Sequence, residues 1–117
     1  MGPVFSVEDP DAVVLGRTGP HASLAVKEFD TWRSVYSMLP LTRELLLGLF
    51  RYAGVHVYSE TFDPFSANKS FVMIHTASAG PKRIVLPGVH DVADALSGRP
   101  VASGVGEIQE TLPMGVT

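Results

Sequence analysis

The fold class of this chain is decided by residues 23–37, which read Ser23-Leu24-Ala25-Val26-Lys27-Glu28-Phe29-Asp30-Thr31-Trp32-Arg33-Ser34-Val35-Tyr36-Ser37. Both halves of this stretch are rich in β-favouring residues, and the second half has the period-two character of a strand. Asp30 and Thr31 provide a polar turn between the halves. We therefore predict a β-hairpin, preceded by a short apolar strand over residues 12–15 that ends at Gly16.

One amphipathic helix is predicted at about residues 42–53. Thr42 follows Pro40 and can serve as the N-cap, because its hydroxyl can accept a hydrogen bond from a backbone N–H that has no partner inside the helix. Gly54 stands where a left-handed C-terminal cap is expected. Apolar side chains between these two positions recur with helical spacing and form one wide face, made of Leu45, Leu46, Leu49, Phe50 and Ala53.

The remainder of the chain reads as short strands with a turn signal about every ten residues. Residues 71–76 form a continuous apolar run that is typical of a central strand covered on both faces. Further strands are expected over residues 55–58, 82–87, 89–95, 101–103 and 108–112. The pattern is typical of a small antiparallel sandwich. We therefore predict an α+β chain that is mainly antiparallel β, with a hairpin layer and the helix in residues 1–54 and a small β-domain in residues 55–117.

Composition narrows the class of protein. With 117 residues, 45% hydrophobic and 18% charged, the chain can form a globular core. Its net charge is −3 and its basic residues are scattered, which argues against a nucleic-acid partner. The longest apolar run, residues 45–50, is much shorter than the roughly 20 residues of a membrane span, and no signal peptide follows Met1. The absence of cysteine is compatible with a bacterial cytosol. We expect a soluble, cytoplasmic protein.

Two carboxylates are candidate catalytic residues. Glu60 and Asp63 lie close together after the strand predicted at residues 55–58 and beside Phe62 and Phe65. Glycosidases use two carboxyl groups ~5–10 Å apart as acid and base or nucleophile. The alternative is an ordinary turn, in which acidic side chains accept hydrogen bonds from nearby backbone amides.

Three aromatic side chains are candidate sugar-binding residues: Trp32, Tyr58 and Phe62. Trp32 with Tyr36, and Tyr58 with Phe62, can provide flat surfaces for a sugar ring. The alternative is packing in the core, which is the commoner role of aromatic residues in alternating strands.

Metal and nucleophile chemistry have little support in the sequence. The four histidines, His21, His56, His75 and His90, are too widely spaced to form a local ligand pair. His75 ends an apolar strand, where a hydrogen bond to the backbone is the simpler expectation. No G-x-S-x-G motif is present. We expect neither a metal site nor a cofactor.

The sequence resembles the C-terminal region of bacterial β-galactosidase-like glycoside hydrolases. Residues 9–17, 25–29 and 32–37 look like the end of a glutamine-amidotransferase-like domain that closes with a helix. Residues 52–59, 67–72, 74–77, 82–87 and 94–102 resemble the small β-domain that follows it in those enzymes. In that family the catalytic glutamates belong to a preceding (β/α)-barrel, so the resemblance assigns no catalytic residue to this chain. It also implies a piece of a longer architecture that continues at both ends.

These observations lead to two functional hypotheses. The first is an accessory or oligomerisation module derived from a carbohydrate-active enzyme, in contact with sugar and assembled as a homo-oligomer, with a dimer favoured because unpaired strand edges promote self-association. The second is a small stand-alone glycoside hydrolase with a carboxylate site, formed by Glu60 and Asp63, near a subunit interface.

Overall fold

The computed structural model describes residues 5–117. The chain divides into a first unit that ends at Leu46 and a second unit from Leu47 to Thr117, and each is described by itself. Among the described residues every strand pair is antiparallel and there is one short helix, which confirms the predicted α+β, mainly antiparallel class. The sequence places the boundary just after the helix, at residues 54 and 55, whereas this division falls inside the helix.

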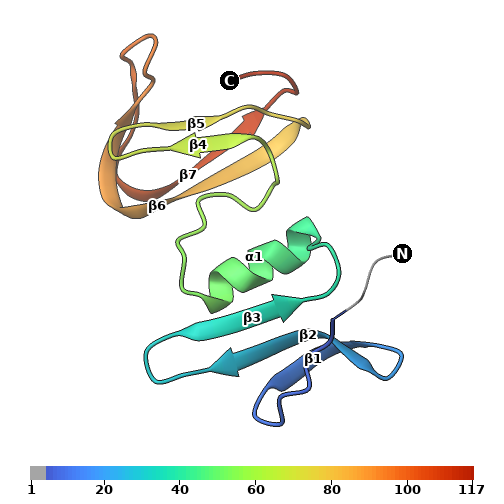
Figure 1. The fold of residues 1–117 in the computed structure, drawn as a ribbon. Coiled ribbons are helices and arrows are strands. Elements are labelled where there is room, and N and C mark those ends of the chain that lie inside the picture. The colour runs from blue at the N-terminus through green and yellow to red at the C-terminus, as the bar shows by residue number, and fades with distance from the viewer. Residues whose placement is uncertain (1–4) are drawn as a thin grey trace. The chain divides into compact units, whose positions relative to one another are not determined.

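The first unit is a three-stranded antiparallel sheet in the order β1-β2-β3 (Figure 1). Its strands are β1 (Val13–Thr18), β2 (His21–Glu28) and β3 (Arg33–Ser37). The predicted hairpin is present as β2 and β3, which pair without any register shift. Strand β1 is less regular, because the register shifts on both sides of Gly16. Within residues 5–46, the buried apolar residues all lie on the central strand β2, namely Ala22, Ala25 and Val26.

The two faces of this sheet differ in what they carry. Val13, Val26 and Val35 lie opposite one another across the three strands and therefore on one face. Val13 and Val35 remain 60% and 39% exposed on that face. The other face carries Ala25 and Tyr36, and the chain before β1 runs along it, since the Tyr36 hydroxyl donates a hydrogen bond to the carbonyl of Phe5.

The helix α1 spans Arg43–Tyr52, as predicted. The Thr42 hydroxyl accepts a hydrogen bond from the Leu45 N–H at 3.2 Å, so Thr42 is the N-cap. Gly54 has a φ of 73°, the left-handed conformation in which glycine commonly ends a helix. Although its apolar face is wide, none of the helix residues is buried.

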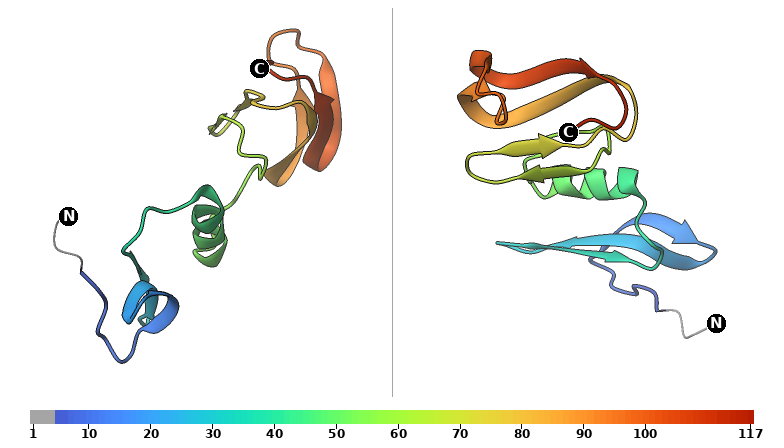
Figure 2. Two further views of the ribbon diagram at one scale, coloured as in Figure 1. Left: turned by 90° about the vertical axis from the view of Figure 1, so that its right-hand side faces the viewer. Right: turned by 90° about the horizontal axis from the view of Figure 1, so that it is seen from above.

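The second unit contains two small sheets, each a two-stranded hairpin. One joins β4 (Phe65–Ala67) to β5 (Val72–Ile74), and the other joins β6 (Gly80–Ala93) to β7 (Pro100–Leu112). The β6–β7 ribbon curves, and the short hairpin lies against one of its faces as the second layer of a small sandwich (Figures 1 and 2).

The four short strands predicted over residues 82–112 are instead two long ones, and this prediction was wrong. The predicted strands left residue 88 and residues 104–107 outside any strand. In a two-stranded ribbon each strand has a free edge, so a proline without an N–H is tolerated there. Gly88 and Gly104, with φ of 134° and 63°, lie where the register shifts between Val85 and Val92, so the chain bulges and continues.

Two further strand predictions were wrong. Residues 55–58 alternate in polarity but form an irregular connection with no strand partner in the described chain. Residues 71–76 were expected to form a covered central strand, yet only Val72–Ile74 is a strand and Phe71 and Met73 are exposed. Periodicity reports which faces could be buried. It does not report whether a partner strand is available on each side.

Candidate functional site

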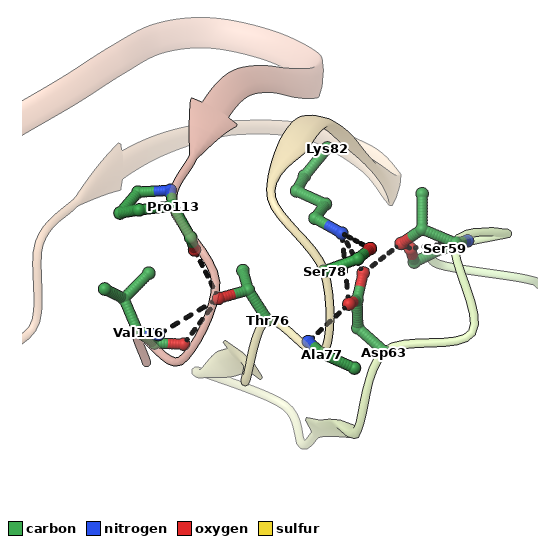
Figure 3. Close-up of polar contacts among 9 residues, drawn as sticks. Ser59, Asp63, Thr76, Ala77, Ser78, Lys82, Pro113 and Val116 are labelled. Atoms are coloured by element: carbon green, nitrogen blue, oxygen red, sulfur yellow. Dashed lines mark hydrogen bonds and ion pairs between the residues drawn. The ribbon is translucent and has the colours of Figure 1, made fainter.

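The second unit contains a buried ion pair between Asp63 and Lys82. The Lys82 ammonium lies 2.8 Å from Oδ2 and 3.0 Å from Oδ1 of Asp63, and the two side chains are 3% and 0% exposed. Asp63 comes from the irregular segment before β4, and Lys82 from the start of β6 (Figure 3). The pair therefore joins the irregular segment before β4 to strand β6.

Every polar atom of this pair is satisfied by its surroundings. Asp63 also accepts hydrogen bonds from the Ala77 N–H at 2.8 Å and from the Thr61 hydroxyl, and Lys82 donates to the Ser78 hydroxyl at 3.2 Å (Figure 3). The hydrogen bond from Lys82, followed by that from Thr61, lowers the pKa of the Asp63 carboxyl from 3.8 to about 2. A general acid requires the opposite shift, and substrate cannot reach a buried carboxylate. The geometry favours a structural role for Asp63.

Glu60, the second predicted catalytic carboxylate, lies on the surface and pairs with Arg51 of the helix. Glu60 and Asp63 thus contact different cations, Arg51 and Lys82. Nothing in this arrangement joins the two carboxylates in one cleft. The catalytic assignment of Glu60 and Asp63 stays a prediction, to be decided by measurement of activity.

A hollow of about 710 Å³ opens beside the ion pair. Its lining comes from Thr61, Pro81, Lys82, Arg83, Gln109, Glu110 and Thr111. Arg83 is engaged with Glu107 at 2.5 Å, and that pairing raises the pKa of the guanidinium. Since the lining contains no aromatic side chain, this hollow offers no flat surface on which a sugar ring could stack.

A second buried polar side chain, Thr76, anchors the C-terminal segment. Its side chain is almost completely buried and its hydroxyl donates to the carbonyl of Pro113 at 2.6 Å (Figure 3). The same oxygen accepts from the Val116 N–H at 3.0 Å, and the Thr76 N–H donates to the Val116 carbonyl at 2.9 Å. Thr76 therefore holds residues 113–116 near the end of β5, the strand that comes just before Thr76 in the chain.

Two of the three predicted sugar-binding aromatic residues lie in the connection between the helix and β4. Tyr58 packs edge-on against His56, with ring centroids 4.6 Å apart, and stacks with Phe65 at 5.3 Å. Phe62 has a φ of 56°, which makes it the one non-glycine residue with positive φ in residues 5–117. Tyr58 is thus engaged within its own unit. The sugar-binding role of Tyr58 and Phe62 stays a prediction.

Trp32, the third predicted residue, is in a different environment. Its ring stacks on that of Phe29, with centroids 4.0 Å apart and planes within 7° of parallel, and the two side chains are 57% and 41% exposed. Trp32 and Phe29 flank the turn of the β2–β3 hairpin, where the Phe29 N–H donates to the Trp32 carbonyl at 2.9 Å. The Lys27 ammonium lies 5.6 Å from the centroid of Phe29.

A hollow of about 240 Å³ lies at this end of the first sheet. Its lining includes polar groups from Asp9, Lys27, Ser34 and Tyr36, together with Phe29. The Lys27 ammonium is 2.5 Å from the Asp9 carboxylate, and this hydrogen bond lowers the pKa of Asp9 and raises that of Lys27. The first unit therefore combines an exposed aromatic surface with a polar hollow.

No group of three or more histidine, aspartate or glutamate side chains in residues 5–117 is arranged to hold a metal ion. His75, expected to bond to the backbone, instead shares a hydrogen bond with the Thr117 hydroxyl at 2.7 Å. Within the same residues, no helix is long and apolar enough to cross a membrane.

Comparison with known proteins found no matching protein-family model, no matching curated protein and no matching solved structure. The resemblance to β-galactosidase-like enzymes therefore stays a prediction.

Sequence reasoning missed Lys82, Thr76 and Phe29. Lys82 and Thr76 carried no signal, because a single lysine or threonine near a strand gives no indication of burial. The position of Phe29 beside Trp32, in contrast, was predictable from the sequence. Residues that flank a two-residue hairpin turn lie directly opposite each other, so the Phe29-Asp30-Thr31-Trp32 sequence is sufficient to place the two rings together.

Proposed function

We propose that this chain is a non-catalytic accessory module of a carbohydrate-active enzyme and that it assembles with a second copy of itself, in a cytosol. The observation that carries the assembly is the small buried core. Among the described residues the buried apolar side chains are Ala22, Ala25, Val26 and Ile74, whereas many large apolar side chains are exposed. Exposed apolar side chains that lie together on one surface mark interaction sites in soluble proteins.

The surface that best fits a second copy is the edge strand β3 with its apolar face. Strand β3 contains no proline and pairs with β2 without a bulge, so it lacks two of the features that commonly protect an edge. The other edge, β1, has register shifts on both sides of Gly16. Unprotected backbone groups along β3 can pair with another strand.

The sequence of β3 is compatible with its own copy in an antiparallel, two-fold arrangement. Centred on Val35, such a pairing sets Ser34 opposite Tyr36 and Arg33 opposite Ser37. No like charges then oppose each other, and the exposed Val13 and Val35 of both copies form one continuous apolar face. These properties support a dimer.

Sedimentation equilibrium on the full chain across the micromolar range tests this proposal. We expect a monomer–dimer equilibrium that Val35→Lys weakens by at least tenfold, since two ammonium groups would meet at the centre of the interface. Leu96→Lys, at the solvent-exposed tip of the β6–β7 ribbon, is the matched control and should leave the dissociation constant unchanged. A chain that is monomeric throughout, or equal weakening by both variants, would refute the proposed interface.

Activity measurements decide between an accessory module and a hydrolase. We expect no hydrolysis of a panel of aryl glycosides by the purified chain. Turnover that disappears in Glu60→Gln would overturn the non-catalytic assignment and identify a stand-alone glycoside hydrolase. Asp63→Asn is less informative in this assay, because the loss of a buried ion pair can abolish activity by unfolding the second unit.

A further inference from the structure

We propose that the Phe29–Trp32 stack and the adjoining hollow form a binding site for a neutral oligosaccharide. This inference rests on the proposed role in a carbohydrate-active protein and adds the location of the site and the class of ligand. The residues involved lie on one face of the β2–β3 hairpin, which carries Ala25, Lys27, Phe29, Ser34 and Tyr36 in alternating register.

The aromatic pair provides a rigid, flat surface. One face of the Trp32 indole is against the Phe29 ring at 4.0 Å, so its exposed area lies mainly on the opposite face and the ring edges. Stacking restricts the rotation of the indole, and a surface that is ordered before binding loses less conformational entropy when a ligand arrives. Exposed tryptophan side chains held in this way are typical anchors of binding sites.

The hollow beside Phe29 provides the polar groups. It is lined by a carboxylate from Asp9, an ammonium from Lys27 and hydroxyls from Ser34 and Tyr36. Asp9 contacts Lys27 at 2.5 Å and Asp11 lies 3.8 Å from the same ammonium, so the group carries a formal charge of −1, which disfavours an anionic ligand and leaves a neutral one. A sugar hydroxyl both donates and accepts, so it can bind the carboxylate and the ammonium together.

The Phe29–Trp32 stack and the adjoining hollow together indicate the class of ligand. A pyranose ring has an apolar C–H face that packs on an aromatic ring and hydroxyls at its rim that require hydrogen bonds. Phe29 lies next to both Trp32 and Lys27, with the Lys27 ammonium 5.6 Å from its centroid, so a ligand that contacts both must extend past the Phe29 ring. We therefore assign one sugar ring to the outer face of Trp32 and a ring farther along the same oligosaccharide to the Asp9–Lys27 hollow.

The sequence makes this site easy to observe, because Trp32 is the single tryptophan of the chain. We expect its fluorescence to change saturably when the full chain is titrated with cellotetraose or β-1,4-galactotetraose, and less or not at all with glucose or sorbitol. Isothermal titration calorimetry should give the same dissociation constant. No response to any tetrasaccharide at millimolar concentration would overturn the proposal.

Three variants test the assigned roles by calorimetry. Trp32→Ala should weaken binding by about tenfold or more, and Trp32→Phe should retain part of it, since loss of a stacking contact costs on the order of one tenfold step. Lys27→Met should weaken binding without removing the fluorescence change. Phe71→Ala, which truncates an exposed aromatic side chain in the second unit, is the control and should bind normally.

The sugar-binding measurements test the site independently of the proposed dimer. Tetrasaccharide binding that is equal in wild type and Trp32→Ala would overturn this site while leaving self-association untouched. A Trp32 emission that changes with protein concentration in the absence of sugar would show that a second copy covers the indole, and would also overturn the site. Binding by Val35→Lys with unchanged affinity would show that the site functions in the monomer.

Discussion

The ammonium of Lys82 lies 2.8 Å from a carboxylate oxygen of Asp63, inside the second unit and away from solvent. The two residues come from the start of β6 and from the segment before β4, so the pair connects parts of the chain that share no backbone ladder. Ser78, Thr61 and the Ala77 N–H complete its hydrogen bonds. In a unit with few buried apolar side chains, this polar network is a principal tertiary contact.

Breaking this pair should destabilise the second unit strongly. Lys82→Met leaves the Asp63 carboxylate buried without its cation, and we expect the thermal midpoint to fall by roughly 15 °C. Arg83→Met is the matched control, because it removes the neighbouring but exposed Arg83–Glu107 pair and should shift the midpoint by only a few degrees. Circular dichroism melts measure both. Equal shifts for the two variants would contradict the structural role of the buried pair.

The same pair predicts how stability depends on pH. The folded pKa of Asp63 is about 2, below its ordinary value of 3.8, so between these values the unfolded chain binds more protons than the folded chain. The stabilisation is fully present above about pH 4 and is lost as the pH falls toward 2. We expect urea midpoints to drop over this window, and Asp63→Asn to show a smaller drop. A parallel decline in both proteins would assign the acid sensitivity to other carboxylates.

Thr76 should anchor the C-terminal segment through its hydroxyl. Thr76→Val keeps the shape of the side chain but leaves the Pro113 carbonyl and the Val116 N–H without this partner. We expect a loss of about 1–3 kcal/mol in the free energy of unfolding and faster amide exchange at Val116. Thr111→Val, at an exposed position of β7, is the control, with a change within about 0.5 kcal/mol. Unchanged exchange at Val116 would argue against the anchor.

Substitution by alanine should change the stability of the protein in opposite directions at two glycines, Gly48 and Gly54. Gly48 lies inside α1 with open space around its Cα, so Gly48→Ala should raise helix stability by about 0.5–1 kcal/mol. Gly54 also has open space but a φ of 73°, so Gly54→Ala should lower stability by about 1 kcal/mol through backbone strain alone. Urea unfolding followed by far-UV circular dichroism measures both. The same sign for the two variants would contradict the C-cap assigned to Gly54.

The local elements of this protein follow from its sequence. The β2–β3 hairpin was predictable because two β-favouring runs flank the polar Asp30-Thr31 turn, and α1 because Thr42 and Gly54 cap an apolar face. These signals act within a few residues of each other, through hydrogen bonds and φ preferences that need no distant partner.

The contacts between distant segments were decided only by the tertiary structure. Separate strands were predicted on either side of residue 88 and of residues 104–107. Strands β6 and β7 instead continue through these positions, because the ribbon bulges there and the two strands remain paired. The role of Asp63 depends on Lys82, nineteen positions away. Sequence alone offered Asp63 as a catalytic carboxylate or a turn residue, since the environment of a carboxyl group, and with it the pKa and access to substrate, is set by whatever the folded chain brings beside it.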